Sequence, residues 1–253
     1  MRQISNVHLK QLGPKAVEYL NQILTLSLSC SVIPDIWKKS VVVPLLKPGK
    51  PAQESNSYRP VSLLCPAIKI LERLILPIMT EHLPIPDFQH GFRKNHSTIT
   101  ALNEFNDDVT NGFNKKIPPD RTVLLQLDLS KAFDMVSHDK VIKDLNSSQL
   151  PSTLKRWMCS YLLGRQSVVN FRNKTSKCLN IRAGVPQGAV TSPLLFSFYL
   201  TNLPRPPKGI KLIQYADDIS IYATGHNIDK LAEAITEYAK EISAFLAERE
   251  LLV

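Results

Sequence analysis

Two apolar segments that carry aspartates constrain the fold of this chain more than any other feature. Residues 122–129 form a near-continuous apolar run with Asp128 near its end, and such a run predicts a strand buried on both faces. Residues 212–223 place Asp217 and Asp218 between two further apolar stretches, which predicts two strands around a tight turn. The fold therefore has to bring carboxylates to the ends of neighbouring strands.

This aspartate pattern has two interpretations. An isolated Asp-Asp pair is typical of a hairpin turn, because Asp tolerates turn conformations. Against that alternative, the turn lacks the glycine that tight hairpins favour, and Asp128 supplies another strand-end carboxylate. Like charges at neighbouring strand ends cost free energy unless cations neutralise them. Since Mg²⁺ binds carboxylates together with substrate phosphates, the pattern favours two-metal phosphoryl transfer.

The remaining periodicity predicts an α+β architecture, because helices and strands are mixed without strict alternation. Apolar side chains recur at helical spacing over 15–29, 68–80, 97–113, 138–145, 154–163, 191–200 and 228–249. Further strands are expected over 41–46, 167–171 and 179–182.

Composition narrows the class of protein. There are 31 Lys and Arg against 22 Asp and Glu, a net charge of +9, which suits a polyanionic partner such as nucleic acid, although many proteins are mildly basic for no specific reason. Four cysteines without CxxC spacing exclude a disulfide scaffold and argue against structural zinc. The apolar stretch 193–200 is too short to cross a bilayer. We therefore expect an intracellular protein of the nucleus or cytoplasm that needs no membrane.

Six blocks in order resemble the motifs of reverse transcriptases from non-LTR (LINE-type, jockey-like) retrotransposons. They lie at 37–50, 57–64, 89–98, 128–134 (Asp-Leu-Ser-Lys-Ala-Phe-Asp), 184–194 (Gly-Val-Pro-Gln-Gly onward) and 215–218 (Tyr-Ala-Asp-Asp). The resemblance covers nearly the full length of the chain, and six motifs in order make it highly specific.

The resemblance implies an RNA-directed DNA polymerase with the fingers and palm of a right-hand fold, whose antiparallel palm sheet is backed by helices. It implies a fingers-like region over 1–120 and a mainly palm region over 121–253, with a fingers-side insertion at about 146–180. The thumb and the upstream endonuclease domain of such elements are expected to be missing, so we interpret the chain as a fragment.

By the same resemblance, Asp128, Asp217 and Asp218 hold two Mg²⁺ ions, which Mn²⁺ could replace. The implied substrates are an RNA template, a DNA primer and deoxynucleoside triphosphates. Phe133 occupies the family's steric-gate position against a ribose 2′-oxygen; without the motif, a core phenylalanine would be the preferred interpretation.

Further residues are implied to contact nucleotide or nucleic acid. Gln187 and Gly188 lie in a Pro-Gln-Gly turn next to the nucleotide, although the same triplet suits an ordinary loop-to-helix junction. Lys47 and Arg59 are implied to bind the triphosphate, with Lys50 competing for the role of Lys47 and a solvated basic loop as the alternative.

Four more residues are expected at the primer and template. Arg93 and Lys94, with His96, are expected at the template backbone. Tyr215 is expected to face away from the aspartate pair and to support the primer end.

Two other functions stay open. One is a group II intron-type maturase, since intron proteins share the Tyr-Ala-Asp-Asp sequence. The other is a truncated or domesticated remnant that binds RNA without polymerising. Incorporation of deoxynucleotides on a primed RNA template separates an enzyme from a remnant.

Overall fold

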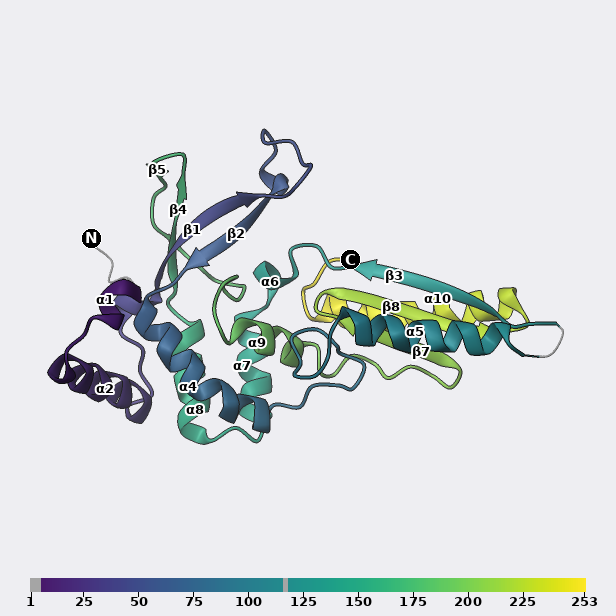
Figure 1. Ribbon diagram of the computed structural model, residues 1–253, viewed down its shortest axis with the longest axis horizontal. Coiled ribbons are helices and arrows are strands. Elements are labelled where there is room, and N and C mark those ends of the chain that lie inside the picture. The colour runs from purple at the N-terminus through teal and green to yellow at the C-terminus, as the bar shows by residue number, and fades with distance from the viewer. Residues whose placement is uncertain (1–5, 116–117) are drawn as a thin grey trace. The chain divides into compact units, whose positions relative to one another are not determined.

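The computed structural model describes residues 6–115 and 118–253 (Figure 1). The helices expected from the sequence are confirmed, each with ends that differ by at most two residues from the expected ones. The expected strands are confirmed within the same margin. Because helices and strands follow one another without strict alternation, the α+β class is confirmed as well.

The described residues fall into two units that interleave along the chain. The first unit comprises Met1–Leu83 and Ser137–Ser192, and the second comprises Pro84–Val136 and Pro193–Val253. The assignment of 1–120 to fingers and of 121–253 to palm stays a prediction, and residues 1–5 and 116–117 of the former lie outside the described residues.

The first unit combines a mixed sheet with helices. Its elements are α1 (Asn6–Lys10), α2 (Pro14–Ser29), α3 (Asp35–Lys38), β1 (Lys39–Leu46), the 3-10 helix η1 (Ser55–Ser57), β2 (Tyr58–Leu63), α4 (Pro66–His82), α7 (His138–Ser147), α8 (Ser152–Leu162), β4 (Gln166–Phe171), β5 (Lys174–Thr175) and β6 (Leu179–Asn180). β1 pairs antiparallel with β2 and parallel with β4, while β4 also pairs with β5 and β6.

The core of the first unit forms on helix faces whose apolar residues recur every three to four positions. On α4, Leu71, Ile75 and Met79 are fully or almost fully buried. On α8, Trp157 and Tyr161 are buried and their rings stack at 5.7 Å. These buried helix faces form the core of the first unit.

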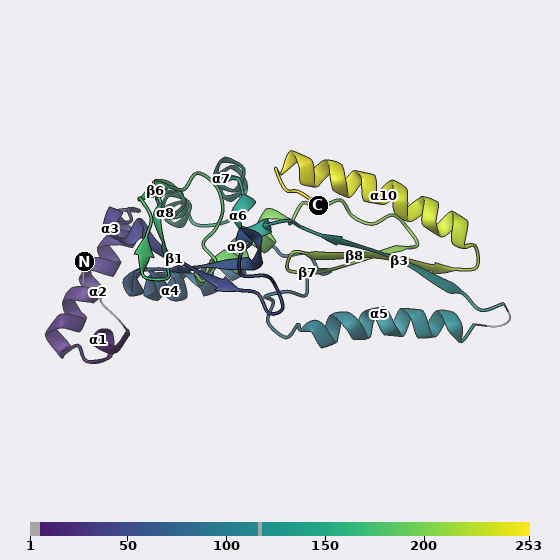
Figure 2. The same ribbon diagram turned by 90° about the horizontal axis from the view of Figure 1, so that it is seen from above.

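The second unit is built on a three-stranded antiparallel sheet in the order β3-β8-β7. Its elements are α5 (Thr98–Phe113), β3 (Arg121–Asp128), α6 (Ala132–Met135), α9 (Ser192–Tyr199, which begins on the last residue of the first unit), β7 (Ile210–Tyr215), β8 (Asp218–Gly225) and α10 (Ile228–Glu248). Figure 2 shows α5 and α10 on opposite sides of this sheet.

Successive side chains of β8 point alternately toward the α5 side and the α10 side of the sheet. Ile219 and Ile221, which are fully buried, point to one face. Tyr222 and Thr224 point to the other, where Tyr222 meets the ring of Phe105 on α5 at 5.0 Å. The even-numbered residues of β8 therefore lie on the α5 side of the sheet, which is the side of Asp218.

The expectation that the 122–129 strand is buried on both faces is wrong. β3 alternates between half-buried and exposed positions, and Leu124 is 43% exposed. The reason is that β3 is an edge strand, and a helix laid over a narrow sheet covers its edge incompletely. Among the described helices, none has both the length and the apolar character that a bilayer crossing requires.

Candidate active site

The strand register brings the predicted aspartates together in the second unit. Asp128 ends β3 and lies directly opposite Asp218, the first residue of β8. Residues directly opposite one another in an antiparallel pair share a face, with Cβ atoms roughly 4.5–5.5 Å apart. Asp217 lies in the turn between β7 and β8. The carboxylates that the sequence places far apart therefore meet at one end of the sheet.

The charges of these carboxylates act on one another. The pKa of Asp218 is raised, first by partial burial and then by the negative charges of Asp217 and Asp128. Within residues 6–115 and 118–253, no lysine or arginine forms an ion pair with any of the three. The centre therefore carries negative charge that the described side chains leave uncompensated.

These aspartates fit divalent cations in the chemistry of their donors. Carboxylate oxygens are hard ligands, and Mg²⁺ commonly takes one or two of them and completes its shell with water and substrate phosphates. In the part of the chain that the structure describes, no three His, Cys, Asp or Glu side chains converge closely enough to hold an ion on their own.

Tyr215 lies on a different face from the expected one. It pairs directly with Asp218 across the hairpin, so both side chains face the α5 side. Both also line a cavity of about 320 Å³ together with Leu102 and Phe105 of α5. The expectation that Tyr215 faces away from the aspartate pair is therefore wrong for Asp218, because the two-residue turn restores the same face. Its contact with the primer end stays a prediction.

Phe133 lies on α6 in an aromatic group of the second unit. Its half-buried ring stacks on Phe196 of α9, with centroids 4.7 Å apart and planes 18° apart, and meets Phe92 edge to face at 6.1 Å. These contacts hold the ring in place, as a steric gate requires, and they equally suit a core phenylalanine. The gate role stays a prediction.

Arg93 and Lys94, which are predicted to contact the template, also belong to the second unit. Arg93 is half-buried, forms an ion pair with Asp87 at 3.1 Å and donates to the carbonyls of Pro86 and Asp87. Its guanidinium thus holds the 86–93 loop together. Lys94 is exposed and is the sterically freer of the two for a template phosphate. Template contact stays a prediction for both.

The predicted nucleotide-binding residues Lys47, Arg59, Gln187 and Gly188 belong to the first unit. The carbonyl of Gln187 accepts from the Ser62 N–H of β2 at 2.7 Å. Gly188 has φ of +112°, and a Cβ there would lie 3.0 Å from the Ser62 carbonyl oxygen. Glycine is needed because the loop turns back so closely against β2.

Lys47 and Arg59 flank the loop that joins β1 to β2. Lys47 follows the last residue of β1, and its N–H donates to the Ser57 carbonyl at 2.8 Å. Arg59 pairs with Leu45 across β1 and β2 and is exposed, as is Lys50. The hairpin thus presents several cations, and the choice of the triphosphate ligand among them stays a prediction.

Sequence analysis missed a buried carboxylate in the first unit. Glu72 of α4 is fully buried and accepts from the Tyr161 hydroxyl at 2.5 Å and from the Val190 N–H at 2.8 Å. Burial raises its pKa despite these donors. Glu72 thereby holds the loop that carries Gln187 and Gly188. The available signal was an acidic residue next to Leu71 on the apolar face of a predicted helix.

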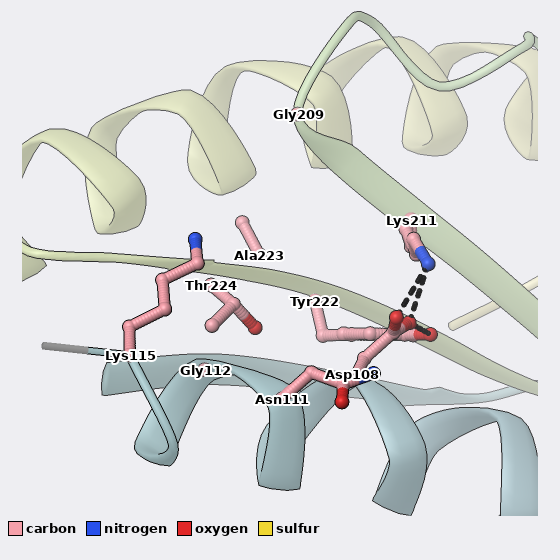
Figure 3. A pocket seen from close by; sticks show the side chains of 9 residues that line it. All are labelled: Asp108, Asn111, Gly112, Lys115, Gly209, Lys211, Tyr222, Ala223 and Thr224. Atoms are coloured by element: carbon pink, nitrogen blue, oxygen red, sulfur yellow. Dashed lines mark hydrogen bonds and ion pairs between the residues drawn. The ribbon is translucent and has the colours of Figure 1, made fainter. Parts of the chain in front are cut away.

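A second carboxylate centre lies at the other end of the same three-stranded sheet (Figure 3). Both oxygens of Asp108 accept from Lys211 Nζ at 2.6 Å, and one also accepts from the Tyr222 hydroxyl at 2.6 Å. Burial alone would raise the pKa of Asp108, but these hydrogen bonds outweigh it and leave the pKa lowered. These residues line a cavity of about 210 Å³.

Comparison with solved structures first defines the class of fold. The chain shares the fold of the telomerase of Candida tropicalis, in a structure truncated of its C-terminal domain, with a TM-score of 0.55 and 11% sequence identity. The match covers 89% of this chain and 52% of that one. The fold is therefore of the reverse transcriptase and telomerase type, with mixed helices and sheets.

Sequence comparison then gives the family. The family model described as "Reverse transcriptase (RNA-dependent DNA polymerase)" matches residues 45–253, and the chain belongs to this family. It is 34% identical over 96% of its length to the "Probable RNA-directed DNA polymerase from transposon BS" of Drosophila melanogaster. It is 33% identical over 93% of its length to the "RNA-directed DNA polymerase from mobile element jockey" of Drosophila funebris. The resemblance to jockey-like elements is confirmed.

The chain spans 28% of the length of the transposon BS relative and 26% of that of the jockey relative.

Proposed function

We propose that this chain carries the RNA-directed DNA polymerase activity of a non-LTR retrotransposon, adding deoxynucleotides to a primer 3′-hydroxyl on an RNA template. The observation that supports the proposal most is the register of β3 and β8, which sets Asp128 opposite Asp218 with Asp217 in the adjoining turn. Uncompensated carboxylates raise the pKa of Asp218, as expected of a centre that is completed by external cations.

The roles of the chain's own carboxylates follow from this arrangement. Asp128, Asp217 and Asp218 would hold the cations and orient them toward the primer end and the triphosphate. Two Mg²⁺ ions bound there supply the charge that favours an ionised 3′-hydroxyl and that stabilises the departing pyrophosphate, and Mn²⁺ could replace them.

Other residues of the second unit would position the primer, the template and the nucleotide sugar. The fixed ring of Phe133 would exclude a ribose 2′-oxygen, Tyr215 would support the primer end, and Arg93 and Lys94 would contact template phosphates. Phe133→Ala is expected to incorporate ribonucleotides more readily in a primer-extension assay. Unchanged discrimination against ribonucleotides would leave Phe133 as a packing residue.

Residues of the first unit would bind the incoming triphosphate and approach the nucleotide sugar or the template base. Lys47 and Arg59 offer a point charge and a bidentate guanidinium to phosphate oxygens. Gln187 and Gly188 present backbone on a loop that Ser62 and Glu72 hold in place. In this proposal 1–120 acts mainly as fingers and 121–253 mainly as palm.

Primer extension tests the proposal. The wild-type chain is incubated with poly(rA)/oligo(dT), labelled dTTP and Mg²⁺, and Asp128→Asn and Asp217→Asn are compared with it. Both variants are expected to lose extension while keeping the Kd for primer–template. Asp107→Asn removes the same charge from an exposed position of α5 and serves as the matched control.

Two results would contradict the proposal. Extension by both aspartate variants at the wild-type rate would remove Asp128 and Asp217 from the reaction. Tight binding of RNA by a wild-type chain that incorporates no nucleotide would favour the non-polymerising remnant instead.

A further inference from the structure

A short segment of the second unit runs alongside the hairpin that carries the aspartates. The Gln214 N–H of β7 donates to the Phe88 carbonyl at 2.7 Å, and the His90 N–H donates to the Gln214 carbonyl at 2.8 Å. Gln89 and Gln214 form an isolated parallel bridge. Residues 88–91 therefore follow β7 to its end, where the turn before Asp217 begins.

The side chain of Gln89 forms hydrogen bonds with the backbone of that turn. It is fully buried, and its Oε1 accepts from the Ala216 N–H at 3.0 Å and from the Gly91 N–H at 2.7 Å. Its Nε2 donates to the Ala216 carbonyl at 3.4 Å, and Gln214 Nε2 donates to the same carbonyl at 2.9 Å. Both polar groups of Ala216 thus bond to side-chain amides.

Ala216 has a backbone conformation that needs such support. Its φ is +58° and it is buried, and an L-residue with a side chain is disfavoured in this left-handed region. Conformations of this kind persist where surrounding contacts determine them, and they gather at functional sites. The residue that follows Ala216 is Asp217.

Gly91 completes the contact. A Cβ at Gly91 would lie 2.3 Å from the Ala216 nitrogen and 2.9 Å from Gln89 Oε1. No side chain fits there without moving the turn or the glutamine. The Gln-x-Gly spacing at 89–91 is therefore explained by the close approach of this segment to the turn.

We infer that Gln89 is a positioning residue, which fixes the peptide before Asp217 and so aims the aspartate pair at the cations it would hold. The inference rests on the proposed function, because the position of Asp217 matters for activity only if its carboxylate takes part in polymerisation. The Gln89 side chain is fully buried and is hydrogen-bonded to the backbone of Ala216 and Gly91.

The test uses Gln89→Met in the full chain, because methionine fills similar space without an amide. Hydrogen exchange of the Ala216 amide is expected to quicken about tenfold once its acceptor is lost. kcat for extension is expected to fall about 10- to 100-fold, as when the partners that orient metal ligands are removed. KM for dTTP and Kd for primer–template should stay within about twofold of wild type, since the Gln89 side chain is fully buried and bonded to backbone.

Two further variants separate positioning from general stability. Gln89→Glu keeps acceptor oxygens for the Ala216 and Gly91 N–H groups, so it should restore slow exchange and part of kcat relative to Gln89→Met. Gln149→Met makes the same change at an exposed glutamine of the first unit and should match wild type in every readout.

Two outcomes overturn the inference. One is an unchanged kcat in Gln89→Met despite faster exchange at Ala216. The other is a loss of kcat and Tm with exchange at Ala216 unchanged, which makes Gln89 a packing residue. Failure of the wild-type chain to extend a primer overturns the proposed function instead, and the exchange measurement still decides whether Gln89 holds the turn.

Discussion

Two carboxylate centres lie on the same face of one three-stranded sheet and differ in what surrounds them. At one end, Asp108 receives hydrogen bonds from Lys211 and Tyr222, and its pKa is lowered. At the other end, Asp218 lies near the carboxylates of Asp128 and Asp217, and its pKa is raised. The sheet and its α5 side are common to both, so the difference comes from the side chains that the sequence places around each aspartate.

This difference separates a carboxylate that has partners within the protein from one that, in the proposed function, would bind a cation. A hydrogen-bonded ion pair satisfies Asp108 within the protein and ties α5 to β7 and β8. Asp128, Asp217 and Asp218 repel one another, and folding alone leaves that repulsion in place. This repulsion costs stability, and under the proposed function a bound cation would restore it.

The largest expected effect is on activity. Asp217→Asn is expected to lower primer extension about 1,000-fold or more, because metal-held charge stabilisation is worth several kcal/mol and each 1.4 kcal/mol is tenfold in rate. Asp108→Asn should keep extension within about threefold of wild type at a temperature where both chains are folded. Equal losses in the two variants would erase the distinction between the centres.

The next largest expected effect is a loss of folding stability when the ion pair between Lys211 and Asp108 is removed. Lys211→Met leaves the partly buried Asp108 carboxylate with one fewer charged donor, and we expect a loss of about 1–2 kcal/mol in the free energy of unfolding. Urea denaturation measures it, with Lys208→Met as control at a lysine that lies just before the strand. A loss no larger than that of the control would mean that the bond of Lys211 to Asp108 adds nothing to stability.

The smallest expected effect is a gain in folding stability when Asp218 is neutralised. Asp218→Asn should stabilise the metal-free chain at neutral pH by at most about 1 kcal/mol, since the group is largely exposed. Added Mg²⁺ should raise the Tm of wild type more than that of Asp218→Asn. Equal shifts in Tm would place the cations elsewhere.

The pH dependence of the two centres should have opposite signs. The folded-state pKa of Asp218 lies above 3.8, so its contribution to stability falls as the pH rises from 3.8 through the folded-state pKa. The folded-state pKa of Asp108 lies below 3.8, so its contribution is present above 3.8 and is lost as the pH falls through the folded-state pKa. Chemical denaturation of Asp218→Asn and Asp108→Asn against pH would show these trends as differences from wild type.

Much of this arrangement could be predicted from the sequence. Helical periodicity is a local property, so the ends of the seven expected helices were found to within two residues, while the short helices α1 and α3 were not expected. The ends of two apolar strands located Asp128, Asp217 and Asp218, because strand ends are also local. The identity of the family followed from six motifs in order.

Register and side-chain partners could not be predicted. The face of Tyr215 depends on how the hairpin closes, and the burial of β3 depends on its place at a sheet edge. The buried Glu72 and Gln89 depend on partners 118 and 127 residues away in the chain. Periodicity within one segment carries no information about such distant contacts.

The parallel pairing of β1 with β4 has a consequence for the synthesis of this chain. Ser40 and Gln166, which are bonded across these strands, lie 126 residues apart. A ribosome adding about 5–20 residues per second needs roughly 6–25 seconds to cover that interval. Once β2 has been made, β1 can pair with it on one side, but its other edge stays open until β4 is made, and open edges pair readily with strands of other chains. The edge of β1 that β4 covers in the folded chain therefore stays open to other strands until translation reaches Phe171.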